Sequence, residues 1–332
     1  MSESFPEVGH AALLAEGLKA FIEQDARRLG GPGLKDPGRR TKLIWPPHSV
    51  SHEFGLGSAD FTDESTVGGY GEAFKVCVAE TPHGFFGRCE TLWNDAQGDT
   101  REEMLANLRL GMEPMLLRRH MIAQTLGMKG LMHFPLKHLG HLDLLKLLYC
   151  ADRDVAMEAR TIIETQASSR LFLPSLLTVL NDRSHPLRRS PQWCVLDMFE
   201  DLPAFAKTKD ESAEVVAAIK DLMWESDDDY CRSIYKAGVV LGGHICTDEA
   251  AEALLELVKA PSRIARRSAS HAVFHLVEWR PEYRETVVEA MTRMATNDAE
   301  ALLRDFARHM ADDIASGASD HVPEPVFPDE AA

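Results

Sequence analysis

A nine-residue pattern recurs five times in the second half of the sequence and limits what the chain can fold into. The consensus is an apolar residue, Arg, two variable residues, a small residue, two variable residues, a small residue and an apolar residue. The copies begin at Val155, Leu187, Cys231, Ala265 and Leu303. Positions one, five, eight and nine lie on one helical stripe, and steps of 32 to 44 residues fit a two-helix unit. We therefore predict five helix–turn–helix repeats over residues 136–316.

Each copy is preceded by an apolar segment that is long enough for a first helix. These segments are residues 136–150, 171–180, 212–224, 249–258 and 284–295. Small residues at positions five and eight of the second helix allow a neighbouring helix to approach closely. A single pair of helices cannot bury its own apolar stripe, so stacking of the repeats is expected to supply the core. The predicted fold class is therefore mainly α.

The arginine at position two is a second regular feature. It occurs as Arg188, Arg232, Arg266 and Arg304, whereas the first copy has Ala156 there. Acidic residues precede several copies, at Asp152, Asp182, 227–229 and Asp298. We expect each acid to cap its helix and to pair with the arginine of a neighbouring repeat, giving a structural arginine ladder. Pro191, inside the second copy, predicts a kink or a shifted helix start.

The acid followed by the pattern V-R-x-x-A-x-x-A-L resembles the repeats of the HEAT family, in particular the short repeats named after phycobilisome lyases. The resemblance covers about residues 136–316 and implies a right-handed α–α superhelix, or solenoid. In such solenoids the inner helices form a concave wall that binds a partner. The polar, Pro-containing residues 317–332 follow the last copy and are predicted to be a disordered tail.

Residues 1–130 are predicted to form a small α/β domain with a leading helix over residues 8–29. The strand candidates are residues 41–45 and 74–78, with a mixed pattern over 85–93 and a hairpin turn at 81–84. The glycine-rich residues 68–71 are expected to be a flexible loop. Asp99 and Thr100, followed by Glu102 and Glu103, predict a capped helix that runs to about Leu126.

This order of strand, turn, strand and helix is similar to the end of HicB-type antitoxin domains. The similar segment is Gly98-Asp99-Thr100-Arg101-Glu102-Glu103-Met104-Leu105-Ala106-Asn107. The resemblance covers residues 72–126, and it implies a fold alone, because here the segment is fused to repeats and no toxin partner is visible.

The overall charge and the N-terminal residues weigh against several classes of protein. A formal net charge of −16 disfavours a broad nucleic-acid surface. The first residues are acidic where an export signal carries lysine or arginine, and no apolar segment has the length of a membrane span. The six cysteines have no CxxC spacing and are expected to be buried free thiols. We expect an acidic cytoplasmic protein without a cofactor.

The candidate binding residues are polar side chains that should point off the buried stripe toward the concave wall. They are Trp193, Arg189, Arg267, His271, His275, His309 and Asp313. His271 and His275 are one helical turn apart, and His309 and Asp313 repeat this spacing, so these four are also candidate metal ligands. Further acidic ligands are scarce in the sequence around them, so contact with a partner is favoured and no metal or catalytic residue is assigned.

The favoured function is a protein–protein interaction scaffold or regulatory adaptor that binds a protein partner on the concave face. One alternative is an enzyme of the HEAT-repeat lyase or hydroxylase kind. The di-iron hydroxylases use His–Glu pairs, however, and the sequence has this pair only at His52-Glu53, outside the repeats. Another alternative is a HEAT-like nucleic-acid binder, because arginines near Trp193 and Trp279 resemble the DNA contacts of HEAT-like alkylpurine glycosylases.

Overall fold

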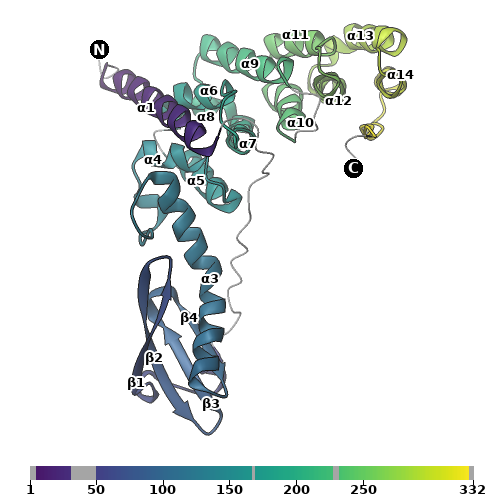
Figure 1. The fold of residues 1–332 in the computed structure, drawn as a ribbon. Coiled ribbons are helices and arrows are strands. Elements are labelled where there is room, and N and C mark those ends of the chain that lie inside the picture. The colour runs from purple at the N-terminus through teal and green to yellow at the C-terminus, as the bar shows by residue number, and fades with distance from the viewer. Residues whose placement is uncertain (1–4, 31–49, 167–168, 227–231, 329–332) are drawn as a thin grey trace. The chain divides into compact units, whose positions relative to one another are not determined.

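The computed structural model describes residues 5–30, 50–166, 169–226 and 232–328. These residues are mainly helical, and they include a small four-stranded sheet toward the N-terminal end of the sequence (Figure 1). The chain divides into two compact units. One, Gly38–Glu158, holds the sheet, and the other combines Met1–Pro37 with Ala159–Ala332. We call them the sheet unit and the helical unit.

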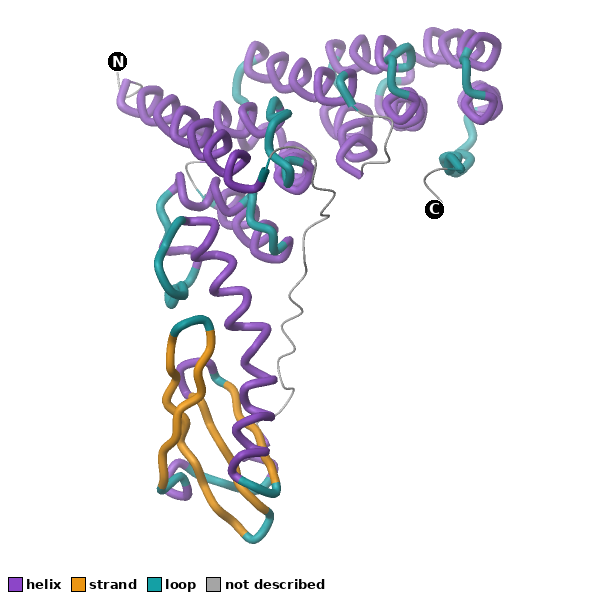
Figure 2. Tube along the Cα trace, in the orientation of Figure 1, coloured by secondary structure: helices purple, strands orange, loops and turns teal. Residues whose placement is uncertain are grey.

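The sheet unit is an antiparallel meander with one long helix against it. Its strands are β1 (Asp63–Gly69), β2 (Glu72–Thr81), β3 (Gly84–Cys89) and β4 (Asn94–Gly98), each paired with the next. Helix α3 (Arg101–Leu126) runs along the sheet (Figure 2). Two short helices, α2 (Val50–Glu53) and η1 (Ser58–Asp60), precede β1, and η2 (Glu90–Leu92) lies between β3 and β4.

Two tight turns set the register of the sheet. Thr81 pairs with Gly84, which confirms the predicted hairpin turn. In the first hairpin, Tyr70 and Gly71 both have positive φ, at 51° and 83°, as a two-residue turn that matches the strand twist requires. The prediction of a loop over residues 68–71 is therefore wrong for its first half, which belongs to β1. The strand candidate at residues 41–45 lies outside the described residues.

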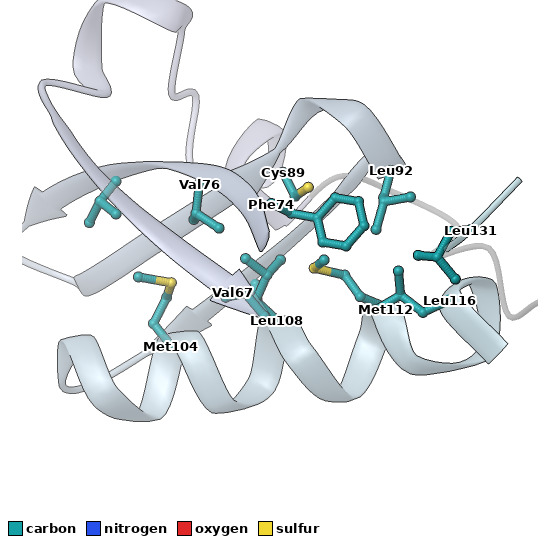
Figure 3. Packing of buried hydrophobic residues seen from close by; sticks show 12 residues of the cluster. Val67, Phe74, Val76, Cys89, Leu92, Met104, Leu108, Met112, Leu116 and Leu131 are labelled. Carbon is teal, nitrogen blue, oxygen red and sulfur yellow. The ribbon is translucent and has the colours of Figure 1, made fainter. Parts of the chain in front are cut away.

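One face of α3 closes the apolar core of the sheet unit (Figure 3). Its buried side chains recur every fourth residue: Met104, Leu108, Met112 and Leu116. The helix begins as predicted, because the Thr100 hydroxyl accepts a hydrogen bond from the Glu103 amide at 3.1 Å. The Glu103 carboxylate in turn accepts from the Asp99 amide at 3.0 Å. Local capping and a simple apolar period therefore account for this part of the fold.

Five helix pairs follow along the chain, at the positions that the sequence predicts. They are α4 (His141–Leu147) with α5 (Arg153–Thr165), α6 (Leu173–Leu180) with α7 (Arg189–Met198), α9 (Lys209–Trp224) with α10 (Arg232–Val239), α11 (Asp248–Leu257) with α12 (Arg263–Trp279), and α13 (Arg284–Asn297) with α14 (Ala301–Ser316). The short segments between them are η3 (Leu136–His138), η4 (Ser169–Phe172), η5 (Phe199–Asp201), α8 (Leu202–Phe205), the π-helical η6 (Val240–Ile245) and η7 (Pro281–Tyr283). The boundary between the two units falls within α5.

Successive pairs in the helical unit contact each other through equivalent helices. Among the first helices, α9 contacts both α6 and α11; among the second helices, α10 contacts α7 and α12, and α12 contacts α14. Within the described part of the helical unit, α6, α9 and α11 therefore form one row and α7, α10, α12 and α14 another. Pro191 shifts the start of α7 to Arg189, as the second copy predicted.

Small residues hold α10 and η6 against α12, as the pattern predicted for position eight. A Cβ atom added to Gly238 would lie 2.8 Å from the Ser268 carbonyl oxygen. One added to Gly242, a turn later in η6, would overlap the Ala272 carbonyl oxygen. The backbones of these segments are therefore in direct contact, and no larger side chain fits between them.

The hydrogen bonds of the described residues show one step of the predicted arginine ladder. Arg266 donates to both carboxylate oxygens of Asp298, at 2.7 and 3.1 Å, between consecutive helix pairs. Arg304 instead binds the carbonyl oxygens of Asp298 and Ala299 in the turn before its own helix. Arg188 donates to the carbonyl of His185, and Arg232 is exposed at the start of α10. Residues 227–229 lie outside the described part of the chain.

The predicted capping by acids holds for Asp152, which directly precedes α5, whereas α7 and α14 have Arg188 and Glu300 at their N-caps, without a side-chain cap hydrogen bond. Asp152, Asp182 and Asp298 each accept a hydrogen bond from the backbone amide two residues later, at 2.8 to 2.9 Å. Each carboxylate thereby closes the turn that leads into the second helix of its pair. The same contact therefore occurs in three of the described helix pairs.

The leading helix α1 (Phe5–Leu29) differs from the prediction, which grouped it with the small α/β domain. It packs against α6 and η4 in the helical unit. Its buried Asp25 accepts a hydrogen bond from Nε2 of His185 at 3.1 Å, and the amide of Leu187 donates to the other ring nitrogen. This link joins residues 160 positions apart, so no local pattern announces it.

Candidate binding face and histidine cluster on α12

Four polar side chains follow one face of α12 at four-residue spacing, and we call them the α12 face: Arg263, Arg267, His271 and His275. This spacing places them above one another on the helix. The sequence predicts that the last three point to an open wall. In the structure Arg267 is only 2% exposed and His271 only 5%. The cover comes from residues 318–328, which we call the tail segment.

The tail segment was predicted to be disordered, and the structure instead packs it on the helical unit. It follows Gly317, which ends α14 in the left-handed conformation, and it contains no helix or strand. Between residues 320 and 327, its exposed side chains recur at every third position, at Asp320, Pro323 and Val326. A repeat of three is that of a polyproline II helix, which the prolines of this segment favour. One side of the segment therefore faces the protein over residues 320–327.

The arginines of the α12 face contact the buried side of the tail segment. Arg267 Nη1 donates to the carbonyl oxygen of Pro325 at 2.7 Å, and its Nε lies 3.3 Å from a carboxylate oxygen of Glu324. The ring of Phe327 is 1% exposed, and the guanidinium carbons of Arg263 and Arg267 lie 4.5 and 5.1 Å from its centroid. A main-chain contact, an ion pair and a cation–π contact thus act together.

A histidine of the tail segment completes a cluster at the other end of the face. The ring of His321 stands edge-on to His271, with centroids 4.4 Å apart, and lies 5.7 Å from the ring of His275. Phe274 covers its other side at 4.9 Å. One ring nitrogen from each of the three histidines lies within 4.8 Å of the other two. Among the described residues, this is the group that combines three metal-binding side chains so closely.

The ring nitrogens of the cluster have specific partners. Nδ1 of His275 lies 3.0 Å from a carboxylate oxygen of Glu278, and Nδ1 of His321 lies 2.8 Å from the carbonyl oxygen of Val322. The Nε2 atoms of His271 and His275 face each other at 3.1 Å. Burial, together with the neighbouring His321 and His275, lowers the pKa of His271 to about 3, so this ring is neutral at physiological pH.

The remaining predicted wall residues are divided between two places. Asp313 supports the tail segment, because its carboxylate accepts a hydrogen bond from the Val322 amide at 3.3 Å. His309 is exposed on α14 and does not join the histidine cluster. Trp193 and Arg189 lie on α7, away from the α12 face, so the structure does not unite the predicted set into one site.

Trp193 lies beside a row of charged side chains on the second helices of the helix pairs. Lys236 of α10 lies 5.4 Å from its ring centroid and 2.8 Å from Asp197 of α7. Asp197 also binds Arg160 of α5 at 2.9 Å. Arg189 is half-buried and donates to Gln192 at 3.3 Å. These contacts link repeats through side chains, which is the role that the sequence assigned to the arginine ladder.

Sequence reasoning missed the tail residues that build the site. His321, Glu324 and Phe327 follow each other at three-residue intervals in a Pro-containing segment. That interval was the available signal, because it places three side chains on one side of a polyproline II helix. It says nothing of which helix they meet.

No known protein family matches the sequence, and neither do curated protein sequences or solved structures. None of the described helices has both the length and the apolar character of a membrane span. The cysteines at 77, 89, 150, 194 and 246 are free thiols, and Cys231 lies outside the described residues.

Proposed function

We propose that this protein is a HEAT-like repeat adaptor whose α12 face binds an extended, Pro-containing segment of a partner protein. In the unbound chain, the tail segment occupies that face as an internal ligand. The two rows of helices support the repeat assignment. The resemblance of residues 72–126 to HicB-type domains adds a fold expectation for the sheet unit and no activity.

The observation that carries this proposal is the manner in which the tail segment is held. Its contacts combine a hydrogen bond to the main chain at Pro325 with side-chain contacts to Glu324 and Phe327. Polyproline II segments are common ligands because their backbone is already extended and its carbonyls are free to accept. A partner segment with an acidic residue three positions before an aromatic one would satisfy the same contacts.

A nucleic-acid function is less well supported by these contacts. The arginines that a phosphate backbone would need, Arg263 and Arg267, already contact Glu324 or Phe327. The net charge of −16 adds long-range repulsion. The same acidic balance does not oppose a protein segment that carries one or two acids, because the local charge of the face is positive.

The tethered tail segment sets the affinity that a partner must reach. An attached segment competes at an effective concentration in the millimolar range. A partner therefore binds well only if its segment is the better ligand or if the tail segment is released first. The protein is then an adaptor whose binding face is occupied by its own tail segment until a partner replaces it.

A labelled peptide with the sequence of residues 318–328 tests the proposal by fluorescence anisotropy. We expect the full-length Phe327→Ala protein to bind it about 10- to 100-fold more tightly than the native protein, because the weakened tail competes less. Adding Arg267→Gln to that variant should abolish the gain. The matched control is Arg308→Gln, which changes an exposed arginine of α14 and should leave binding unchanged. Equal binding to the native and Phe327→Ala proteins would contradict the proposal.

A further inference from the structure

We propose that His271, His275 and His321 form a binding site for a divalent transition-metal ion of the zinc type, which fastens the tail segment to α12. The site goes beyond the adaptor function, and its regulatory consequence rests on that function. Imidazole nitrogen is a preferred donor for zinc and its neighbours in the first transition series.

The first support is that the hydrogen bonds of the cluster cannot all be satisfied by neutral rings. If His275 donates from Nδ1 to Glu278, its Nε2 carries a lone pair, and Nε2 of His271 must donate to it. Nδ1 of His271 is then a lone pair buried 3.9 Å from a carboxylate oxygen of Glu324. That nitrogen has no hydrogen-bond partner among the described residues.

Other tautomers of the neutral His271 and His275 rings also place two hydrogen-bond acceptors next to each other. A proton moved to Nδ1 of His271 leaves two lone pairs facing each other at 3.1 Å. A proton moved to Nε2 of His275 turns its Nδ1 lone pair toward the Glu278 carboxylate, 3.0 Å away. A cation between the two Nε2 atoms removes the conflict, because both lone pairs then point to it and both Nδ1–H groups point to carboxylates.

The third histidine favours a metal ion over a proton as that cation. A proton bridges two nitrogens, whereas the cluster brings a third within 4.8 Å. His321 uses Nδ1 to contact the Val322 carbonyl, so its Nε2 remains as the donor. Three histidines with an open fourth position are an established zinc arrangement.

The distances fit a site that closes on binding. Two nitrogens bound tetrahedrally to one zinc ion at about 2.0–2.1 Å are about 3.3 Å apart. The His271 and His275 nitrogens are already 3.1 Å apart. His321 needs to approach by about 1.5 Å to reach the tetrahedral spacing, and it lies in a segment without helix or strand. The Tyr235 hydroxyl is 3.4 Å from Nε2 of His271, beside the cluster.

The outer contacts have the form that metal-binding histidines use. A ligating ring commonly donates its second N–H to a carboxylate or a backbone carbonyl, which fixes the tautomer and the orientation of the ring. Glu278 supplies the carboxylate for His275, and Val322 supplies the carbonyl for His321. The cluster therefore has an outer layer for two of its three rings.

The consequence for the protein is a metal-dependent hold on the tail segment. Two ligands lie on α12 and one lies on the tail segment, so a bound ion joins them. Release of the tail from the α12 face then requires loss of the His321 bond. The metal would keep the adaptor closed, and its removal would expose the face to a partner.

Zinc titration of the untagged full-length protein, in competition with a chromophoric chelator, tests the site. We expect one Zn²⁺ per chain. Because loss of an outer-layer partner already costs 10- to 100-fold in affinity, His321→Ala and His275→Ala should each weaken binding at least about 100-fold, and Glu278→Ala about 10-fold. His309→Ala, which alters an exposed histidine outside the cluster, is the matched control. His321→Ala changes only the tail segment, so a loss of binding in this variant cannot result from unfolding of α12.

Co²⁺ replaces Zn²⁺ as a spectroscopic probe of geometry. We expect visible absorption of a four-coordinate site in the native protein and its loss in His321→Ala. Binding that is equal in native, His321→Ala and His309→Ala proteins would overturn the site, as would absence of binding in the native protein.

The regulatory consequence is tested with the Phe327→Ala protein and the labelled tail peptide. Zn²⁺ should weaken peptide binding at least about tenfold, and a chelator should restore it. If Zn²⁺ binds through the three histidines but leaves peptide binding unchanged, the metal site stands and its control of the face is refuted. If the peptide never binds while Zn²⁺ does, the adaptor proposal fails and the metal site stands.

Discussion

The sheet unit and the helical unit bury different kinds of side chain. Among the described residues of the sheet unit, the buried polar side chains are Ser51, Asn94 and Asp152, of which Asp152 is ionisable. The helical unit buries Asp25, Asp182, His185, Arg267 and His271 among its described residues. The core around the sheet is thus mainly apolar, with one buried polar contact between Ser51 and Asp95, whereas the helical unit buries several ionisable side chains that join distant segments.

This difference shows where each unit is sensitive. An apolar core tolerates the loss of any one contact in proportion to the volume removed. A buried polar pair fails when one partner is lost, because the other remains desolvated without a hydrogen bond. The buried ionisable contacts of the helical unit are therefore expected to respond to protons, ions or a competing ligand.

The largest effect is expected from Leu108→Ala in the core of the sheet unit. Leu108 is fully buried, so the cavity should cost about 2–5 kcal/mol. Hydrogen exchange should rise across residues 50–131 and stay unchanged in α9 to α14. The matched control is Leu110→Ala, since Leu110 is exposed on the same helix and should be neutral. Faster exchange throughout α9 to α14 would show that the two units do not unfold separately.

Gly242→Ala should give the next largest effect, in the helical unit. The added methyl group overlaps the Ala272 carbonyl, and such overpacking costs about 1–3 kcal/mol. Exchange should rise in η6 and α12. Gly243→Ala is the neighbouring control, because its Cβ would meet ordinary van der Waals contact at 3.9 Å. Equal effects of both substitutions would contradict the close contact between η6 and α12.

Asp25→Ala tests the assignment of α1 to the helical unit. The substitution leaves the buried Nε2–H of His185 without its acceptor, which costs about 1–3 kcal/mol. Limited proteolysis should then cleave within α1 first, while the sheet unit keeps its native exchange rates. Glu23→Ala, at an exposed position of the same helix, should change neither. If limited proteolysis cleaved the sheet unit earlier than α1, the assignment of α1 to the helical unit would be contradicted.

The smallest expected effect is a dependence of the α1 contact on acid pH. Burial raises the pKa of Asp25, but hydrogen bonds and charges from His185 and Arg28 outweigh it, so the pKa lies below its ordinary value of 3.8. The stabilisation is therefore complete above about pH 4 and is lost as the pH falls further through the folded pKa.

Hydrogen exchange of α1 between pH 5 and pH 2.5, after correction for intrinsic rates, measures this loss. Asp25→Asn keeps an acceptor for His185 but cannot titrate, so its α1 stability should be lower and flat over the same range. A flat profile in the native protein would show that the Asp25 carboxylate does not hold α1.

Much of the helical fold follows from local sequence. The copies beginning at Val155, Ala265 and Leu303 place apolar residues at helical intervals, and Asp152 and Asp298 close the turns before the first and the last of them. Such signals act over a few residues, so they are visible in a single sequence. The alternation in β2 and the cap of α3 at Thr100 are of the same kind.

The sequence predicts only part of the candidate site, because local patterns do not reveal contacts between distant segments. The spacing of His271 and His275 revealed one half of the cluster, because both lie on one helix. The other half, His321, is about 50 residues away in a segment whose composition indicated disorder. The amino-acid composition of a segment indicates whether that segment can fold by itself. The tail segment instead packs on a surface built by other residues.

The sequence by itself determined where helices begin, which sides of them are apolar, and which small residues allow close packing, because these properties repeat within a few turns of the chain. Only the tertiary structure decided that α1 joins the helical unit, that the tail segment covers the α12 face, and that three histidines meet there. These contacts link residues 46 to 160 positions apart. Such pairings depend on the shape that the whole chain adopts, and they leave no period in the sequence.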